Sequence, residues 1–176
     1  MRAVFSVLTL VILLSGIAAA GNMTDMKFIN MDRFQIDSLL TVTAAKDLPV
    51  TDRMQFYSGI FLDMPYNLIC AGDGADALYE TYPLVNFKET NCMVFVEHVL
   101  ALSISDSWDN FFNNLQQIRY KNGIIGMRTR NHYTMADWLP ENDWLLEDAT
   151  AKVASDKAEQ VTGRQNILQW SSIRKG

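Results

Sequence analysis

The stretch Thr90-Asn91-Cys92-Met93-Val94-Phe95-Val96-Glu97-His98-Val99-Leu100-Ala101-Leu102 decides how this chain is interpreted. It begins with residue types that cap helices and continues as an apolar run, which predicts a helix over 91–103 with Thr90 as its N-cap. Cys92 then lies in the first turn, where unpaired backbone N–H groups and the positive end of the helix dipole favour a thiolate. Cys92 is therefore the candidate nucleophile.

Two other interpretations of Cys92 remain open from the sequence. Free cysteine is among the most buried residue types, so Cys92 could be a structural thiol among its apolar neighbours. In an exported protein it could also form a disulfide with Cys70. These two are the only cysteines in the chain, which is too few for a disulfide-dense scaffold or a zinc finger.

Apolar residues at helical spacing predict further helices over 28–45, 52–62, 107–120 and 145–154. In the first of these, the apolar set comprises Phe34, Ile36, Leu39, Leu40 and Val42. Gly72-Asp73-Gly74 predicts a loop within 70–82, and Lys121-Asn122-Gly123 predicts the end of the helix before it. With 124–138 expected to be irregular or extended, the chain is predicted to be rich in helix and poor in strands.

Composition and the first residues constrain the class of protein. The chain has 176 residues, 49% of them hydrophobic, and a net charge of -5, which fits one globular domain and argues against nucleic-acid binding. Residues 1–20 have a positive Met1-Arg2 start, an apolar run and an Ala18-Ala19-Ala20 end, the layout of a secretory signal peptide more than of a membrane anchor. We expect a periplasmic or secreted protein of residues 21–176, without stable membrane insertion.

His132 is the candidate base. It lies in a polar segment with arginines and aromatic residues, and Asp137 follows closely enough to orient it. His98 is six residues after Cys92, about 240° around the helix, so it faces elsewhere. His132 could equally be an exposed or packed histidine that satisfies local backbone groups. The cysteines and histidines lack the paired spacings of zinc sites, so we predict no metal and no cofactor.

Four ordered motifs resemble the N-acetylmuramoyl-L-alanine amidase-like family, which is related to NlpC-type papain-like cysteine peptidases. Residues 90–102 resemble its nucleophile helix, and Gly72-Asp73-Gly74 with Pro83-Leu84 resembles the loop before that helix. Ile118-Arg119-Tyr120-Lys121-Asn122-Gly123 and Arg130-Asn131-His132-Tyr133 through Asp137-Trp138 resemble two later segments. The resemblance implies an α+β, papain-like (NlpC-type) fold, present here mainly as the helical N-terminal portion with few strands.

The same resemblance implies a cell-wall hydrolase, an amidase or peptidase that cuts amide bonds of peptidoglycan or muropeptide with Cys92 as nucleophile. It also implies that six residues of the motifs contact the substrate: Asn91, Tyr120, Arg130, Tyr133, Asp137 and Trp138. The family's later H-V-G-type segment, which carries its catalytic histidine, has no match after Trp138. We therefore expect the domain of residues 21–176 to be incomplete at its C-terminal side, with His132 as the remaining base. The alternatives are an inactive, truncated member that binds wall peptide and an exported helical interaction module.

Overall fold

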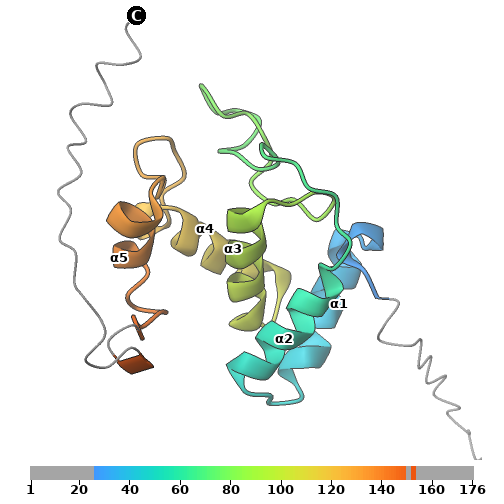
Figure 1. The fold of residues 1–176 in the computed structure, drawn as a ribbon. Coiled ribbons are helices and arrows are strands. Elements are labelled where there is room, and N and C mark those ends of the chain that lie inside the picture. Colours follow the sequence, from blue (N-terminus) through green and yellow to red (C-terminus); the bar gives the residue numbers. More distant parts are fainter. Residues whose placement is uncertain (1–25, 150–151, 154–176) are drawn as a thin grey trace, which may run out of the picture.

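The computed structural model describes residues 26–149 and 152–153, so the predicted signal peptide lies outside the described residues. In chain order the elements are η2 (Phe28–Asn30), α1 (Arg33–Ala44), α2 (Val50–Ile60), α3 (Cys92–Ser103), α4 (Trp108–Arg119), η3 (Lys121–Gly123), the π-helical turn η4 (Thr134–Trp138) and α5 (Leu139–Glu141). The central helix is α3, which packs against both α2 and α4 (Figure 1). No helix in the described ranges is long and apolar enough to cross a bilayer.

A side chain at the N-cap satisfies one of the first N–H groups of α1, α3 and α4, whereas Pro49 before α2 forms no such bond. The side chain of Ser107 caps α4 by accepting from the N–H of Asn110. Asn91, and not Thr90 as predicted, caps α3 by accepting from the N–H of Val94. Thr90 instead forms an isolated bridge with Tyr66, so its backbone is already engaged outside the helix.

The side of α1 that faces the core differs from the predicted apolar set. Its buried residues are Ile36, Leu40 and Thr43, which recur every three or four positions. Phe34 and Val42 are 77% and 57% exposed, because their positions fall on the opposite side of that period.

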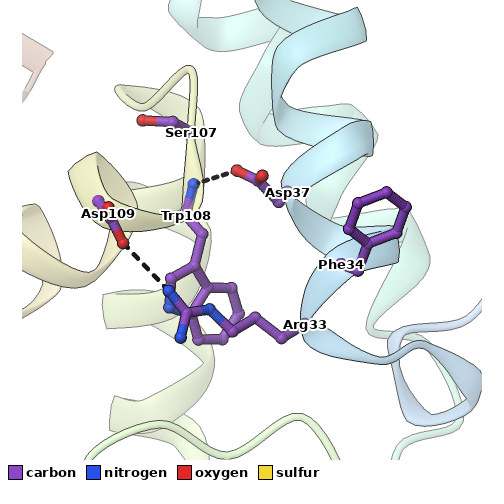
Figure 2. Close-up of a pocket in the computed structure, with 6 residues that line it drawn as sticks. All are labelled: Arg33, Phe34, Asp37, Ser107, Trp108 and Asp109. Atoms are coloured by element: carbon purple, nitrogen blue, oxygen red, sulfur yellow. Dashed lines mark hydrogen bonds and ion pairs between the residues drawn. The ribbon is translucent and has the colours of Figure 1, made fainter.

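A carboxylate of α1 caps α4 from outside that helix. Asp37 Oδ1 accepts from the backbone N–H of Trp108, the first residue of α4, at 2.6 Å (Figure 2). Arg33 lies over the Trp108 ring, 5.1 Å from its centroid, and pairs with Asp109 at 3.1 Å. Because N–H groups in a first turn have no partner within the helix, Asp37 both satisfies one of them and fixes α1 against α4.

The predicted α+β, papain-like fold class is wrong for the part of the chain that the structure describes, which is helical and contains no sheet. In place of paired strands, the described residues contain two isolated bridges, from Tyr66 to Thr90 and from Tyr120 to Arg130. Residues 61–91 form a long irregular connection because Pro65 and Pro83 lack an N–H to donate to a ladder, and Gly72 and Gly74 weaken extended pairing.

The C-terminal part of the described chain also departs from expectation. The helix predicted over 145–154 is absent over 145–149, and of its remainder only 152–153, which are helical, are described. The segment 124–138, expected to be irregular or extended, ends in η4, and α5, whose second residue is Pro140, follows it directly. Proline fits the first turn of a helix because its missing N–H would have no partner there.

Candidate active site

The loops that flank the α3–α4 pair gather at the end where α3 begins. Residues 61–91 extend beyond that end, and the loop after α4 lies on the same side (Figure 1). The two loops line one cavity of about 710 Å³, formed by residues 73–79, Leu84 and residues 124–129. Asp73, Gly74 and Leu84 of one motif therefore face the loop after α4 across this cavity, whereas Cys92 and His132 are not among the residues that line it.

Cys92 is the first residue of α3, and its side chain is exposed. The side chain and the carbonyl of Asn91 accept from the N–H groups of Val94 and Phe95, each at 2.9 Å. The N–H groups of Cys92 and Met93 have no hydrogen-bond partner within the described chain. Unpaired N–H donors at the positive end of a helix can stabilise an oxyanion that forms beside this exposed thiol.

The second thiol is in a different environment. Cys70 is buried with Ala71 and Val94, and this burial raises the pKa of the Cys70 thiol. The structure has both cysteines free, so it does not contain the disulfide considered as an alternative. The structural-thiol interpretation fits Cys70 and not the exposed Cys92.

His132 is exposed, and its ring is held by the backbone. Its Nε2 lies 2.9 Å from the carbonyl oxygen of Met127. Because a carbonyl only accepts, Nε2 carries the proton in this arrangement and Nδ1 carries the lone pair of a base. In the described residues no hydrogen bond joins His132 to Cys92 or to Asp137.

The segment that follows His132 runs alongside α3. The Thr134 hydroxyl lies 4.0 Å from Met93 Sδ, and the Trp138 indole N–H donates to Glu97 at 3.2 Å. In each pair the two residues are 41 positions apart in the sequence. The segment 134–138 and α3 therefore run in the same direction.

The other histidine, His98, which the helical spacing predicts to face elsewhere than Cys92, belongs to the core. His98 is fully buried in a cluster of aromatic rings, Phe61, Phe87 and Phe111. Its Nε2 accepts from the N–H of Asn86 at 3.3 Å. Burial, and secondly the charge of Arg119, lower the pKa of His98 to about 3. A buried neutral imidazole on this side of α3 does not serve Cys92 as a base.

We expect the contribution of His98 to the free energy of unfolding to fall as the pH is lowered below 6.5, the ordinary pKa of histidine. The folded pKa of His98 is lowered, so between about pH 6.5 and pH 3 the unfolded chain binds the additional proton, with a slope approaching about 1.4 kcal/mol per pH unit. Glu97 has the opposite effect on stability, because burial raises the pKa of Glu97 in the folded protein. Above the ordinary carboxyl pKa the folded chain binds the additional proton, so lowering the pH there increases the free energy of unfolding. Urea denaturation at a series of pH values should show a shallower slope for His98→Gln. The exposed His132→Gln is the matched control, and an unchanged slope in His98→Gln would contradict the expectation.

Tyr120 and Arg130 are both predicted to contact substrate. In the structure their side chains bind the loop before α3, which lines the cavity. The Tyr120 hydroxyl is buried and donates to Asp73 Oδ1 at 2.7 Å and to the Gly72 carbonyl at 3.2 Å, and burial raises the pKa of Tyr120. Arg130 pairs with the same Asp73 carboxylate at 3.2 Å and also with Glu80. A role in substrate contact remains a prediction for both residues.

Three other predicted residues also have structural partners. Asn91 caps α3 and donates from its side-chain amide to the Leu68 carbonyl at 3.0 Å. Asp137 Oδ2 accepts from the N–H of Tyr133 at 3.2 Å, which closes the turn before η4. Trp138 is 4% exposed, so its ring lies in the interior. The described residues contain no group of three or more His, Cys, Asp or Glu side chains that could hold a metal ion.

Sequence reasoning did not identify the buried ion pair between Glu97 and Arg119, whose charged atoms lie 3.4 Å apart. Arg119 also donates to the carbonyl oxygens of Leu84 at 2.6 Å and Gly72 at 3.2 Å. The available signal was Glu97 itself, a carboxylate inside an otherwise apolar helix. Such a residue needs a buried partner, although the sequence does not say which one.

Comparisons with known proteins show which family the chain belongs to. A solved structure of a Legionella pneumophila protein of the DUF1460 family has 30% sequence identity and a TM-score of 0.65, over 73% of this chain and 43% of that chain. A solved N-acetylmuramoyl-L-alanine amidase from Bacteroides uniformis has 32% identity and a TM-score of 0.48, over 58% of this chain and 46% of that chain. The chain thus spans less than half the length of either protein, and no curated protein matches it. The sequence model described as N-acetylmuramoyl-L-alanine amidase-like matches residues 56–172, and the chain belongs to that family.

Proposed function

We propose that this chain carries the nucleophile of an exported amidase or peptidase that cuts amide bonds in the peptide part of peptidoglycan, with Cys92 as the attacking residue. The observation that carries the proposal is the exposed Cys92 at the start of α3, beside the unpaired N–H groups of Cys92 and Met93. Membership of the N-acetylmuramoyl-L-alanine amidase-like family supports the class of bond and the class of substrate.

In the proposed reaction the Cys92 thiol gives its proton to His132 Nδ1, and the sulfur attacks the carbonyl carbon of the amide. The N–H groups of Cys92 and Met93 donate to the oxyanion that forms. His132 then gives the proton to the departing amine, and the C–N bond breaks to leave a thioester on Cys92. Water hydrolyses the thioester and restores the thiol.

A second candidate function is binding of wall peptide without cleavage. It is supported by the absence, in the part of the chain that the structure describes, of a hydrogen bond between Cys92 and His132 and of a carboxylate bonded to His132. Binding of peptidoglycan without any release of amino groups would favour this candidate.

The proposal is tested by incubating the purified chain with peptidoglycan and measuring new amino groups. Time-dependent release is the expected result, and mass spectrometry of the soluble products would identify the bond. No release at any pH between 5 and 9 would contradict an amidase. Export through residues 1–20 is a separate part of the proposal, tested by N-terminal sequencing of the periplasmic or secreted protein, which should begin at Gly21.

A further inference from the structure

The cavity of about 710 Å³ between the loop before α3 and the loop after α4 has mostly apolar walls. Large side chains from both loops line it and are exposed: Leu78, Tyr79, Ile124, Ile125 and Met127. Soluble proteins rarely leave many such residues together in contact with water unless the surface binds something. The volume lies within the range of about 300–1,000 Å³ in which proteins bind small ligands.

Both walls of the cavity are held in place by hydrogen bonds within their own loops. On one wall the N–H of Asp73 donates to the Glu80 carbonyl at 2.7 Å. On the other wall the N–H of Lys121 donates to the Thr129 carbonyl at 2.7 Å, and the Thr129 hydroxyl donates to the Gly126 carbonyl at 2.8 Å. A ligand that enters the cavity therefore does not bear the cost of ordering these loops.

The Asp73 carboxylate gives the cavity a charged acceptor. The residue is 9% exposed, and its Oδ1 accepts from the Tyr120 hydroxyl at 2.7 Å and pairs with Arg130 at 3.2 Å. Its Oδ2 accepts from no group of the described chain and is not among the fully enclosed polar atoms there, so it opens onto the cavity that Asp73 lines. An oxygen in this position can accept from a ligand, and an ammonium group is a strong donor to it.

The other charges around the cavity distinguish the two ends of a ligand. Asp76 lies on the same loop as Asp73, and Arg128 lies on the opposite loop. Within the part of the chain that the structure describes, neither Asp76 nor Arg128 forms an ion pair. The aspartates favour an amino group, and the guanidinium of Arg128 fits a carboxylate. The N–H groups of Ile125 and Met127 also lack a partner among the described residues, which favours a peptide over a lipid chain, because a peptide has carbonyl groups to accept from them.

We propose that this cavity binds a short peptide that has a free amino terminus, small apolar side chains and a free carboxylate. The amino group binds Asp73 Oδ2, the carboxylate binds Arg128, and the side chains of the peptide pack on the apolar walls. Neither Cys92 nor His132 lines the cavity, so the inference does not rest on the proposed amidase. It assigns residues to peptide binding, which the second candidate function leaves unassigned.

The test follows the backbone amide signals of the wild-type chain by NMR while tri-L-alanine is added. We expect the signals of residues 73–79 and 124–129 to shift in a saturable way. N-acetyl-tri-L-alanine should bind roughly tenfold more weakly, because it lacks the ammonium group. Triglycine carries both charges without side chains and should also bind more weakly. Equal affinities for tri-L-alanine and its N-acetyl form would overturn the proposal, as would shifts confined to other residues or no shifts up to the solubility of the peptide.

Substitutions test the two charged contacts separately. Asp73→Asn keeps an oxygen for the Tyr120 hydroxyl and replaces the free oxygen by an amide NH₂ group, so it should weaken tri-L-alanine binding roughly tenfold. Arg128→Met should weaken binding of tri-L-alanine but not of its C-terminal amide. Arg33→Met is the matched control, because Arg33 is exposed on α1 and does not line the cavity. A folded Asp73→Asn protein with the wild-type affinity would overturn the proposal, and the peptide pairs decide the question on the wild-type chain if that variant does not fold.

The outcome for this cavity can be separated from the outcome for the proposed function. Cys92→Ala should bind tri-L-alanine as the wild-type chain does, because the cavity does not include Cys92. Peptide binding without amide cleavage would support this site and contradict the amidase. Amide cleavage without peptide binding in the cavity would contradict this site alone.

Discussion

Replacing Cys92 with alanine is expected to reduce the release of amino groups from peptidoglycan to the level measured without protein. The sulfur of Cys92 forms the bond to the carbonyl carbon in the proposed reaction, so an alanine leaves only the N–H donors at the start of α3, which have no nucleophile to assist. His132→Ala should have a smaller effect, a loss of about 10²–10⁴-fold, because it removes the base and acid but keeps the thiol.

Cys70→Ala is the matched control for this experiment. The same atom is removed from a thiol that is 2% exposed and packs on Val94, so the variant should keep most of the activity at temperatures where it remains folded. Circular dichroism melting curves of all three variants would verify that they are folded in the assay. Undiminished release by Cys92→Ala would contradict a cysteine nucleophile, whatever the other variants do.

Local sequence information predicted the helices that carry the site, because each begins at a capping residue and repeats its apolar residues at helical spacing. Cys92 at the first turn of α3 followed from the residues beside it. The one-residue error in the cap arose because Thr90 and Asn91 are both good N-caps, and the choice depends on the bridge from Thr90 to Tyr66.

The loop before α3 could not be predicted in the same way, because side chains from distant parts of the chain hold it. Arg119 reaches the Gly72 carbonyl across 47 residues, and Arg130 reaches Asp73 across 57. Periodicity describes which side of a helix is apolar but not which loop a buried arginine binds. The resemblance alone predicts that Tyr120 and Arg130 contact substrate; in the structure their polar groups bind the loop, and the substrate role stays a prediction.

The fold class was the largest error and has a related cause. The α+β expectation came from a resemblance carried by short motifs, and those motifs lie on helices and irregular loops in the described residues. None of them is an alternating apolar and polar run of the kind that forms a strand with one buried face. The motifs identified the family, but only the path of the chain between them determines whether a sheet is present.

Arg119→Met is expected to destabilise the folded protein by about 3–5 kcal/mol, which is the usual cost of breaking a buried ion pair from one side. Arg119 is 1% exposed, and its loss leaves the Glu97 carboxylate buried without its cation. It also leaves the Gly72 and Leu84 carbonyl oxygens without the donor that they share. Urea denaturation at pH 7 would measure this as a lower midpoint. Lys121→Met, which breaks the exposed neighbouring pair with Glu141, is the control and should have a much smaller effect.

The pH dependence separates the uncompensated charge from lost packing. Burial raises the pKa of Glu97, and Arg119 is the largest influence that lowers it, so removing Arg119 raises the folded pKa further. A group with a raised folded pKa contributes stability that is present at low pH and is lost as the pH rises through the folded pKa. The deficit of Arg119→Met relative to wild type should therefore be smaller at pH 5 than at pH 8. Arg119→Met combined with Glu97→Gln should recover part of the loss at pH 8, because the neutral amide still accepts from Trp138 and carries no charge to compensate. A deficit of equal size at both pH values, without recovery in the double variant, would mean that Arg119 stabilises the fold through packing and its carbonyl bonds alone.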